Sequence, residues 1–448
     1  MAQKLIMATG IPKKSRSSLN CGMELSYEGK VPESVVLESL PADIFIRNME
    51  LYPNRLYYGD NLNVLKHLLR DKSVCRQVRL VYIDPPFSTQ STFLSRKQKY
   101  AYEDTLAGPE FIEFLRKRLI LLRELLADDG SIYLHLDEKM VFHMKIVMDE
   151  IFGENNYRNC ITRKKCNPKN YTRKTYGNIS DYILFYTKTS EYVWNRPVEP
   201  WTEDRAKEYQ YIETETGRRF MKVPIHAPGI RNGETGKPWR GMMPPPGKHW
   251  QYPPAKLDEM DARGEIYWSA NGNPRRKIYL DQNEGIGVQD IWLDFKDAHN
   301  QNICITGYPT EKNPAMLQLI IEASSNPNDL VLDCFSGSGT TLAAASCLGR
   351  RWIGVDNSPE AIKTIFERFE KGIKPMGDFV EKKSAEQNKQ YVLNQPALFN
   401  SSGTAVKKDG KLNHHIPVTD FAFLSDTDNL PDGEPFVRIR LQNLKKQK

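Results

Sequence analysis

Apolar positions in this chain of 448 residues follow two patterns that alternate along much of its length. Short apolar runs predict strands, and longer stretches in which apolar residues recur every three or four positions predict helices. The expected strands include Val81–Ile83, Ser131–Leu136, Tyr182–Tyr186, Leu330–Leu332 and Trp352–Asp356. Because strands and helices alternate, the chain is predicted to form an α/β fold with a doubly wound parallel sheet.

The same pattern divides the chain into segments. Residues 1–50 form a basic, serine-rich opening and a small lead-in, and residues 51–190 carry the first α/β half. Residues 191–300 contain six of the seven tryptophans and 11 of the 28 prolines, which predicts a loop-rich insertion domain that contacts a partner. The α/β pattern returns in residues 301–375, and residues 376–448 are polar and aperiodic, as is typical of a tail.

Composition narrows the class of protein. Charged residues make up 27% of the chain, and no apolar run approaches the roughly 18 residues that a membrane span needs. The opening sequence has no apolar signal-peptide region, so a cytoplasmic protein is expected. The seven cysteines are scattered, as in a reducing compartment, and Cys160 and Cys166 lack a second ligand pair, so no metal site is predicted.

Charge is concentrated in one place. Residues 155–180 contain no acid, although the net charge of the chain is only +7, and tyrosines lie between their cations. The cations are Arg158, Arg163, Lys164, Lys165, Lys169, Arg173 and Lys174. Cations interleaved with rings are typical of loops that track phosphates and stack on bases. A solvated basic loop is the alternative; beside a nucleobase site, nucleic-acid binding is favoured.

The first candidate site is Asp84-Pro85-Pro86-Phe87, directly after the expected strand Val81–Ile83. Neither proline can donate to a strand ladder, so Asp84 and Phe87 are expected on a stiff turn. This turn lies at the carboxyl end of a strand, where open α/β sheets bind their ligands. An acceptor, a carbonyl and a ring suit a flat molecule with an exocyclic amine, although a simple strand stop would also explain the prolines.

The second candidate site is a glycine turn between an expected strand and an expected helix, at residues 333–341. Gly337 and Gly339 allow a ligand to approach the backbone closely, and the helix amino terminus favours a negative group. Asp356 ends the next strand, near the roughly 20-residue spacing at which an acid receives a ribose hydroxyl. The turn lacks the third glycine of the dinucleotide pattern and the Gly-Lys-Ser/Thr of a phosphate loop, so NAD and ATP are disfavoured.

Together these motifs resemble the beta-class DNA amino-methyltransferases, with a layout most like the modification subunits of type III restriction systems. The similarity covers roughly residues 51–375. It implies a permuted Rossmann-like fold that depends on S-adenosylmethionine, with a target-recognition insertion at residues 191–300. Asp84–Phe87 is similar to the family's catalytic tetrapeptide, and residues 333–341 are similar to its cofactor loop.

Further cofactor contacts follow from the resemblance alone. Gly59-Asp60 is similar to the segment that contacts the cofactor's adenine, and residues 308–312 are similar to the segment that holds its methionine end. Here Asn313 interrupts the family's usual Lys-Pro pair, and Cys334 replaces the commoner proline. The implied cofactor-binding residues are Asp60, Thr310, Lys312, Asp333, Phe335, Gly337, Ser338, Gly339, Thr340 and Asp356.

The resemblance also implies a reaction. A methyl group passes from S-adenosylmethionine to the exocyclic amine of a base flipped out of double-stranded DNA. Asp84 and the Pro85 carbonyl are expected to accept the two amine hydrogens, and Phe87 is expected to stack on the base. Asp-Pro-Pro-aromatic favours adenine N6 in this family, and cytosine N4 is the alternative. No Pro-Cys dipeptide occurs, which argues against cytosine C5.

Two rival hypotheses stand beside this one. A non-catalytic nucleic-acid binder with a vestigial cofactor fold is disfavoured because Asp84 and the glycine turn are intact. An RNA or protein methyltransferase is disfavoured because the large aromatic insertion suits a duplex. The family suggests a homodimer, and since no ATPase or nuclease motif is found, any restriction activity must lie in another chain.

Overall fold

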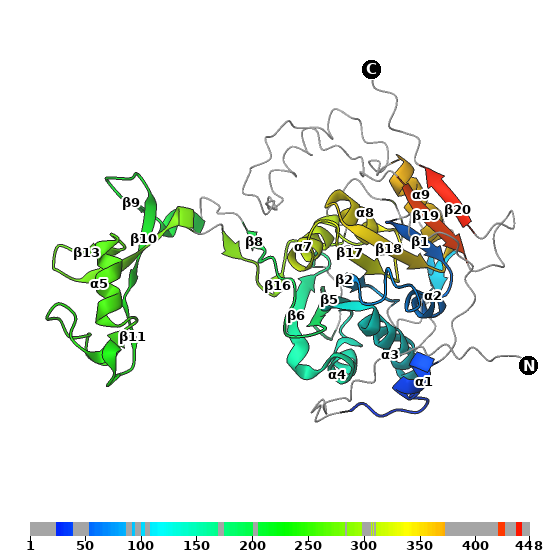
Figure 1. Cartoon of the computed structure of the whole chain (residues 1–448), viewed down its shortest axis with the longest axis horizontal. Coiled ribbons are helices and arrows are strands. Elements are labelled where there is room, and N and C mark those ends of the chain that lie inside the picture. The colour runs from blue at the N-terminus through cyan, green and yellow to red at the C-terminus, as the bar shows by residue number, and fades with distance from the viewer. Residues whose placement is uncertain are drawn as a thin grey trace, which may run out of the picture. The chain divides into compact units, whose positions relative to one another are not determined.

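The structure describes two compact units, each with its own core (Figure 1). An α/β unit comprises the described residues up to 197 and from 289 on, and a smaller unit comprises residues 198–288. No helix in these described parts is long and apolar enough to cross a bilayer. The structure is a computed structural model that describes residues 24–38, 53–86, 92–94, 100–103, 108–168, 174–199, 205–282, 285–297, 306, 308, 311–371, 420–425 and 436–440.

A ten-stranded sheet forms the centre of the α/β unit. In spatial order its strands are β16 (Ile291–Trp292), β6 (Tyr157–Lys164), β7 (Ser180–Thr187), β5 (Leu126–Leu136), β2 (Val78–Ile83), β17 (Leu330–Asp333), β18 (Arg351–Asp356), β1 (Arg55–Tyr58), β19 (Asp420–Ser425) and β20 (Phe436–Arg440). The strands from β5 to β1 run parallel, so their carboxyl ends meet at one edge. The late strands β17 and β18 lie between the early strands β2 and β1, so the two halves of the chain interleave as the permuted fold requires.

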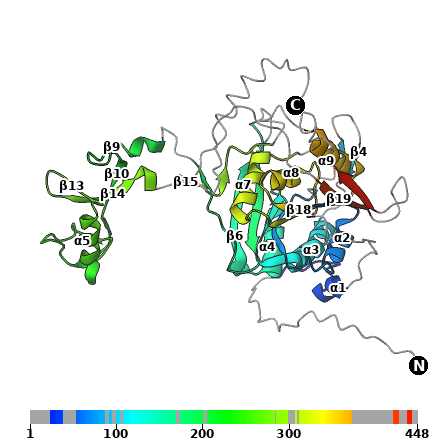
Figure 2. The same ribbon diagram turned by 45° about the horizontal axis from the view of Figure 1, so that its top comes forward.

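Helices cover both faces of this sheet (Figure 2). On one face, α1 to α4 share a core with inward-facing residues of β2, β5, β17 and β18. On the other face, the Tyr133 hydroxyl lies 2.8 Å from the Ser324 hydroxyl of α7. The Trp352 indole N–H donates to Ser346 of α8, and its ring stacks on Phe369 of α9. The helices are α1 (Glu33–Glu38), α2 (Asn61–Leu68), α3 (Gly108–Leu125), α4 (Val141–Phe152), α7 (Pro314–Ser324), α8 (Thr340–Cys347) and α9 (Pro359–Lys371), with a 3-10 turn, η2 (Glu154–Asn156).

Local sequence signals set the starts of the two helices nearest the strand ends. The Asp60 carboxylate accepts a hydrogen bond from the Leu62 backbone N–H at 2.6 Å and so caps α2. The Asn313 side chain accepts from the Ala315 N–H at 2.9 Å, and Pro314 occupies the first turn of α7. Both helices therefore begin at residue types that commonly cap helices.

One side of the sheet differs from the prediction. β7, expected as the third parallel strand, runs antiparallel to both β5 and β6, so the sheet is mixed. β6 occupies residues 157–164 of the basic segment that was expected to be a loop. Ile161 and Arg163 are buried in this strand. A charged residue at an inward position breaks the apolar alternation by which a strand is recognised.

The opposite edge also differs. β19 pairs in parallel with β1 and antiparallel with β20, so part of the segment expected to be a tail belongs to the sheet. Phe421 and Leu424 are buried there, and the Phe421 ring lies 5.4 Å from the Trp352 ring. Within the stretch between the first candidate site and α3, β3 (Thr92–Leu94) pairs antiparallel with β4 (Tyr100–Glu103).

The smaller unit lies within the predicted insertion at residues 191–300. Three of its tryptophans form a core: the Trp239 ring lies 5.2 Å from the Trp268 ring and 6.0 Å from the Trp250 ring. Many of the insertion's rings therefore stabilise a small domain. Its elements are β8 (Val198–Glu199), η3 (Arg205–Glu208), β9 (Tyr211–Ile212), β10 (Arg219–Pro224), β11 (His226–Pro228), η4 (Glu234–Gly236), β12 (Lys248–Trp250), α5 (Pro254–Ala262), β13 (Ile266–Trp268), β14 (Pro274–Tyr279), η5 (Leu280–Gln282) and β15 (Ile286–Gly287).

Candidate active site

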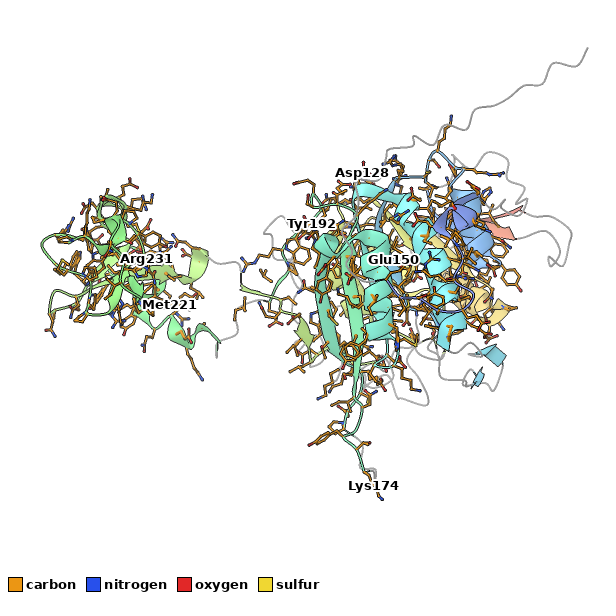
Figure 3. All side chains as sticks on the ribbon, turned by 90° about the horizontal axis from the view of Figure 1, so that it is seen from below. Asp128, Glu150, Lys174, Tyr192, Met221 and Arg231 are labelled. Carbon is orange, nitrogen blue, oxygen red and sulfur yellow. The ribbon has the colours of Figure 1, made fainter. Side chains whose placement is uncertain are left out.

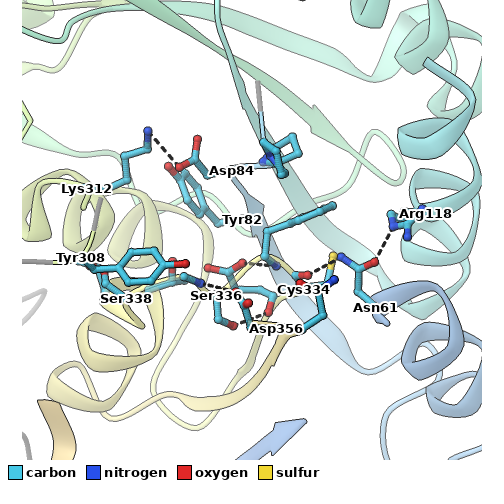
Figure 4. Close-up of a pocket in the computed structure, with 18 of the residues that line it drawn as sticks. Asn61, Tyr82, Asp84, Arg118, Tyr308, Lys312, Cys334, Ser336, Ser338 and Asp356 are labelled. Atoms are coloured by element: carbon cyan, nitrogen blue, oxygen red, sulfur yellow. Dashed lines mark hydrogen bonds and ion pairs between the residues drawn. The ribbon is translucent and has the colours of Figure 1, made fainter. Parts of the chain in front are cut away.

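A pocket lies at the edge where β1, β18, β17 and β2 end (Figure 4). It brings the two candidate motifs together, although they are far apart in the chain. The predicted residues that line it are Asp60, Asp84, Pro85, Pro86, Lys312, Asp333, Phe335, Gly337, Ser338, Thr340 and Asp356. Gly339 lies directly beside the pocket as the residue before α8. Phe87 and Thr310 lie outside the described residues.

Asp84 follows the last residue of β2, and its side chain joins the two halves of the chain. Its Oδ2 atom lies 3.0 Å from Lys312 Nζ. Its Oδ1 atom is buried and has no hydrogen-bond partner among the described residues, and His135 Nδ1 lies 3.8 Å from it. The side chain as a whole is 18% exposed, so the carboxylate faces the pocket through its Oδ2 side. Pro85 and Pro86 follow directly and also line the pocket.

Lys312 has a neighbour that the sequence did not suggest. The family resemblance assigns it to the methionine end of the cofactor, and the structure pairs its ammonium with Asp84. Asn313, which separates Lys312 from Pro314, begins α7 and donates to the Lys296 carbonyl at 3.1 Å. Lys312 is therefore the last residue before a fixed helix end, and it places a positive charge beside the candidate catalytic carboxylate.

The glycine turn holds its shape through positive φ angles and one carboxylate. Gly337 and Gly339 have φ angles of 49° and 73°, which L-residues with a side chain rarely adopt. A Cβ atom at Gly339 would lie 2.8 Å from Ile365 Cγ1 of α9. Asp356, at the end of β18, accepts from the Gly337 N–H at 2.7 Å and from the Ser358 N–H at 2.8 Å. Gly337, which carries no side chain, therefore lines the pocket with its backbone.

Two buried carboxyl groups give the pocket a preference for positive ligands. Burial raises the pKa of Asp333 to about 7, and the nearby charges of Asp84 and Asp356 add to this. Burial also raises the pKa of Asp356 to about 6. A cation placed near these groups would stabilise their ionised forms, so the pocket favours a ligand with positive charge.

The sequence did not reveal a third part of the pocket, which links α2, α3 and the glycine turn. The Asn61 amide donates to the Cys334 carbonyl at 2.7 Å and accepts from Arg118 Nε at 2.6 Å. The Arg118 guanidinium lies 3.5 Å from the Phe114 ring centroid, and burial lowers its pKa to about 10. Arg118 interrupts the apolar stripe of α3, which is the one sequence signal that could have marked it.

The predicted nucleic-acid residues separate into buried and exposed groups. Arg163 is fully buried: it donates to the Phe295 carbonyl and pairs with Asp181 and Asp297, so its assignment as a phosphate contact is wrong. Lys165 also pairs with Asp181, at 2.9 Å.

Arg158 lies over the Tyr192 ring and donates to the Thr187 hydroxyl. Lys164 is half-buried, and Lys174 is exposed at the far end of the β6–β7 pair (Figure 3). Lys169 and Arg173 lie outside the described residues. Of the described cations in this segment, Lys174 is therefore the one that is best placed to meet a partner.

Comparisons with known proteins find a matching family and several relatives. A family model described as DNA methylase, of the N6/N4 type, matches residues 78–367. The chain is 46% identical to the Type II methyltransferase M.EcaI of Enterobacter cloacae over 86% of this chain and 89% of that protein. It is 27% identical to the StyLTI Mod subunit, a type III restriction-modification enzyme of Salmonella typhimurium, over 66% of this chain and half of that subunit. A solved structure of the M1.HpyAVI–SAM complex is 17% identical, with a TM-score of 0.37, and the match covers 70% of this chain and 98% of that one.

Proposed function

Because the chain belongs to the N6/N4 DNA methylase family, we propose that it methylates the exocyclic N6 amine of adenine in double-stranded DNA, with S-adenosylmethionine as the methyl donor. The observation that carries the proposal is the position of Asp84, which faces the same pocket as the glycine turn at Gly337. An acceptor for an amine and a backbone cradle for a cofactor therefore share one space. The Asp-Pro-Pro sequence at 84–86 is the basis for preferring adenine to cytosine.

The residues of the pocket fit S-adenosylmethionine. Gly337 and Gly339 allow the close backbone approach that a nucleoside needs. Asp356 lies at the strand end from which an acid receives ribose hydroxyls in related sheets. The buried carboxyls of Asp333 and Asp356 suit the positive sulfonium and ammonium groups of this cofactor. When bound, it supplies a methyl group that is activated by the sulfonium charge.

The chain's own residues orient the amine. Asp84 Oδ2 accepts one amine hydrogen and the Pro85 carbonyl accepts the other, which turns the nitrogen lone pair toward the methyl donor. Oδ2 can keep its contact with Lys312 at the same time, because a carboxylate oxygen accepts in two directions. Catalysis then rests on positioning and on electrostatic complementarity. Stacking of Phe87 on the base stays a prediction.

The remaining parts of the proposal concern partners. We propose that the unit of residues 198–288 recognises the target sequence and that Lys174 contacts phosphate. The StyLTI relative is named as a subunit of a restriction-modification enzyme, and we propose the same setting for this chain, in the cytoplasm and as a homodimer. Any restriction activity would then lie in a separate subunit.

Methyl transfer with product analysis tests the proposal. The protein is incubated with tritium-labelled S-adenosylmethionine and, in parallel reactions, with unmethylated DNA, RNA or protein, and the nucleosides from digested DNA are identified by mass spectrometry. N6-methyladenine is the expected product. N4-methylcytosine would replace the adenine proposal by its alternative, and label found only in RNA or protein would contradict a DNA substrate.

An Asp84→Ala variant tests the assignment of the carboxylate. Transfer is expected to fall to background, because the amine loses the acceptor that orients it, while cofactor affinity stays within about twofold of wild type. Asp84→Asn is the matched control: it keeps one acceptor oxygen at the same size and is expected to retain part of the rate. Undiminished methylation by Asp84→Ala would contradict the assignment.

A further inference from the structure

A chain of buried polar side chains lies behind Asp84, outside the motifs named above. His135, on β5, has no exposed surface. Its Nδ1 atom lies 2.9 Å from the Tyr82 hydroxyl and 3.8 Å from Asp84 Oδ1. Its Nε2 atom lies 3.4 Å from Asp181 Oδ2 on β7. The imidazole therefore sits between two carboxylates, one that faces the pocket and one that faces the interior of the sheet.

Asp181 is an ionised anchor at the inner end of this chain. Its side chain is 3% exposed, and it contacts Lys165 Nζ at 2.9 Å and Arg163 Nη1 at 3.4 Å. Burial alone would raise the pKa of Asp181, but its interactions with His135, Lys312 and Lys165 outweigh burial and hold the pKa well below its usual range. An ionised carboxylate can only accept, so a hydrogen shared with His135 Nε2, which lies 3.4 Å away, belongs to the ring.

This arrangement fixes the state of the imidazole. Burial lowers the pKa of His135, and the nearby Lys312 charge adds to this, so the ring is neutral at pH 7. With its one hydrogen on Nε2, toward Asp181, the ring presents a lone pair at Nδ1, to which the Tyr82 hydroxyl donates. Nδ1 and Asp84 Oδ1 are then two neighbouring acceptors, and Oδ1 is the buried atom that has no hydrogen-bond partner among the described residues.

Asp84 Oδ1, 3.8 Å from His135 Nδ1, is a buried acceptor without a donor among the described residues, and such an acceptor costs about 1–3 kcal/mol. Amine methylation releases one proton for each turnover. We propose that the Asp84–His135 pair holds the proton that the target amine loses, with His135 as a positioning residue that acts through Asp84. The inference rests on the proposed function.

The balance of the step is simple. The nitrogen lone pair forms the new N–CH₃ bond while the electron pair of the C–S bond stays on sulfur, and the amine nitrogen becomes cationic. One of its hydrogens then passes as a proton to Asp84 Oδ2. A half-turn of the carboxyl group about its soft terminal torsion brings this proton to His135 Nδ1, while the Tyr82 hydroxyl turns away. Asp181 stabilises the resulting imidazolium, and the proton returns to water through Asp84 after the product leaves.

The rate of single-turnover methyl transfer, measured between pH 5 and 9, tests the proposal. Cofactor and DNA are saturating, so groups whose titration affects only binding do not change this rate. The wild-type rate is expected to fall as the pH drops through the pKa of His135, below 6.5, because a protonated ring has no place for another proton. His135→Gln can still bond to Asp181 and Tyr82 but cannot take up a proton. We expect its rate near pH 7.5 to fall by about 10²-fold, with loss of that acid limb and with cofactor and DNA affinities within about twofold of wild type.

Two further variants separate this role from a structural one. Tyr133→Phe removes a buried hydroxyl from the same strand and face, two residues away, and should keep the wild-type rate and acid limb. Tyr82→Phe removes the donor that favours neutral His135, so its acid limb should move to higher pH.

The outcomes are distinct. A His135→Gln protein with the wild-type rate and limb would overturn the inference, and so would a loss of rate shared equally by Tyr133→Phe. If His135→Gln does not fold, an unchanged acid limb in Tyr82→Phe overturns it in the same way. A wild-type protein that methylates no DNA would overturn the proposed function itself, whereas an active wild type with an unaffected His135→Gln removes only the inference.

Discussion

Replacing Arg163 by methionine is expected to destabilise the α/β unit and to leave its electrostatic attraction for DNA unchanged. The guanidinium is fully buried, lies 2.5 Å from Asp297 Oδ1 and 3.4 Å from Asp181 Oδ2, and donates to the Phe295 carbonyl at 2.6 Å. Removing one partner of a buried ion pair costs about 3–5 kcal/mol, because the other charge stays buried without compensation. Asp181 keeps Lys165 in the variant, so we expect the lower end, about 3 kcal/mol.

Thermal unfolding and salt-dependent DNA binding measure the two effects separately. At about 2–4 °C for each kcal/mol, the Tm of Arg163→Met should fall by roughly 6–12 °C. A lost phosphate contact would instead lower the slope of log affinity against log salt by about 1. Lys174→Met is the matched control: its side chain is exposed, so its Tm should stay within about 1 °C of wild type. An Arg163→Met protein with an unchanged Tm and a reduced salt slope would refute the assignment.

Two more predictions concern the glycine turn and the acid before it. Burial raises the pKa of Asp333 in the folded protein from 3.8 to about 7. Without cofactor, the folded protein therefore binds a proton at Asp333 more tightly than the unfolded chain does. The free energy of unfolding should fall as the pH rises from about 4 to about 7. Asp333→Asn should reduce this fall, which Tm values at pH 5.5 and pH 8 without cofactor would show; an equal fall in both proteins would contradict it. An alanine in the left-handed conformation lowers the free energy of unfolding by about 1–2 kcal/mol. Gly339→Ala should lower it further, because its Cβ atom also meets Ile365. Gly349→Ala is the control, with a φ angle of 69° and open space around it, and should lower it by that amount alone. Equal unfolding free energies for these two variants would show that the contact with Ile365 does not matter.

The elements around the pocket could be predicted because their signals are local. Proline and glycine act on the backbone of their own and neighbouring residues, so Pro85 and Gly337 marked the ends of strands without any knowledge of the fold. Caps such as Asp60 and Asn313 act within two or three residues in the same way. The family resemblance then joined two stretches that no local signal connects.

The parts that sequence reasoning missed depend on distant contacts. Arg163 belongs to a strand because Asp181 and Asp297 neutralise it, and neither acid is near it in the chain. The pairing of Asp84 with Lys312 and the link from Asn61 to Cys334 also join residues from opposite halves. A run of cations in the sequence therefore does not show whether its side chains are exposed, because acidic partners from other strands can bury them.

The interleaved sheet has a consequence for how the protein is made. Val81 pairs with Leu332, and Tyr57 pairs with Val355, so β2 and β1 leave the ribosome long before these neighbours exist. At about 5–20 residues per second, the open edge of β2 waits roughly 10–50 s for a partner that is about 250 residues away. Exposed apolar strand edges favour wrong pairing and aggregation during that interval. Synthesis of this chain should therefore depend on chaperones that shield nascent strands, and slower translation of the insertion should lower the yield of native protein.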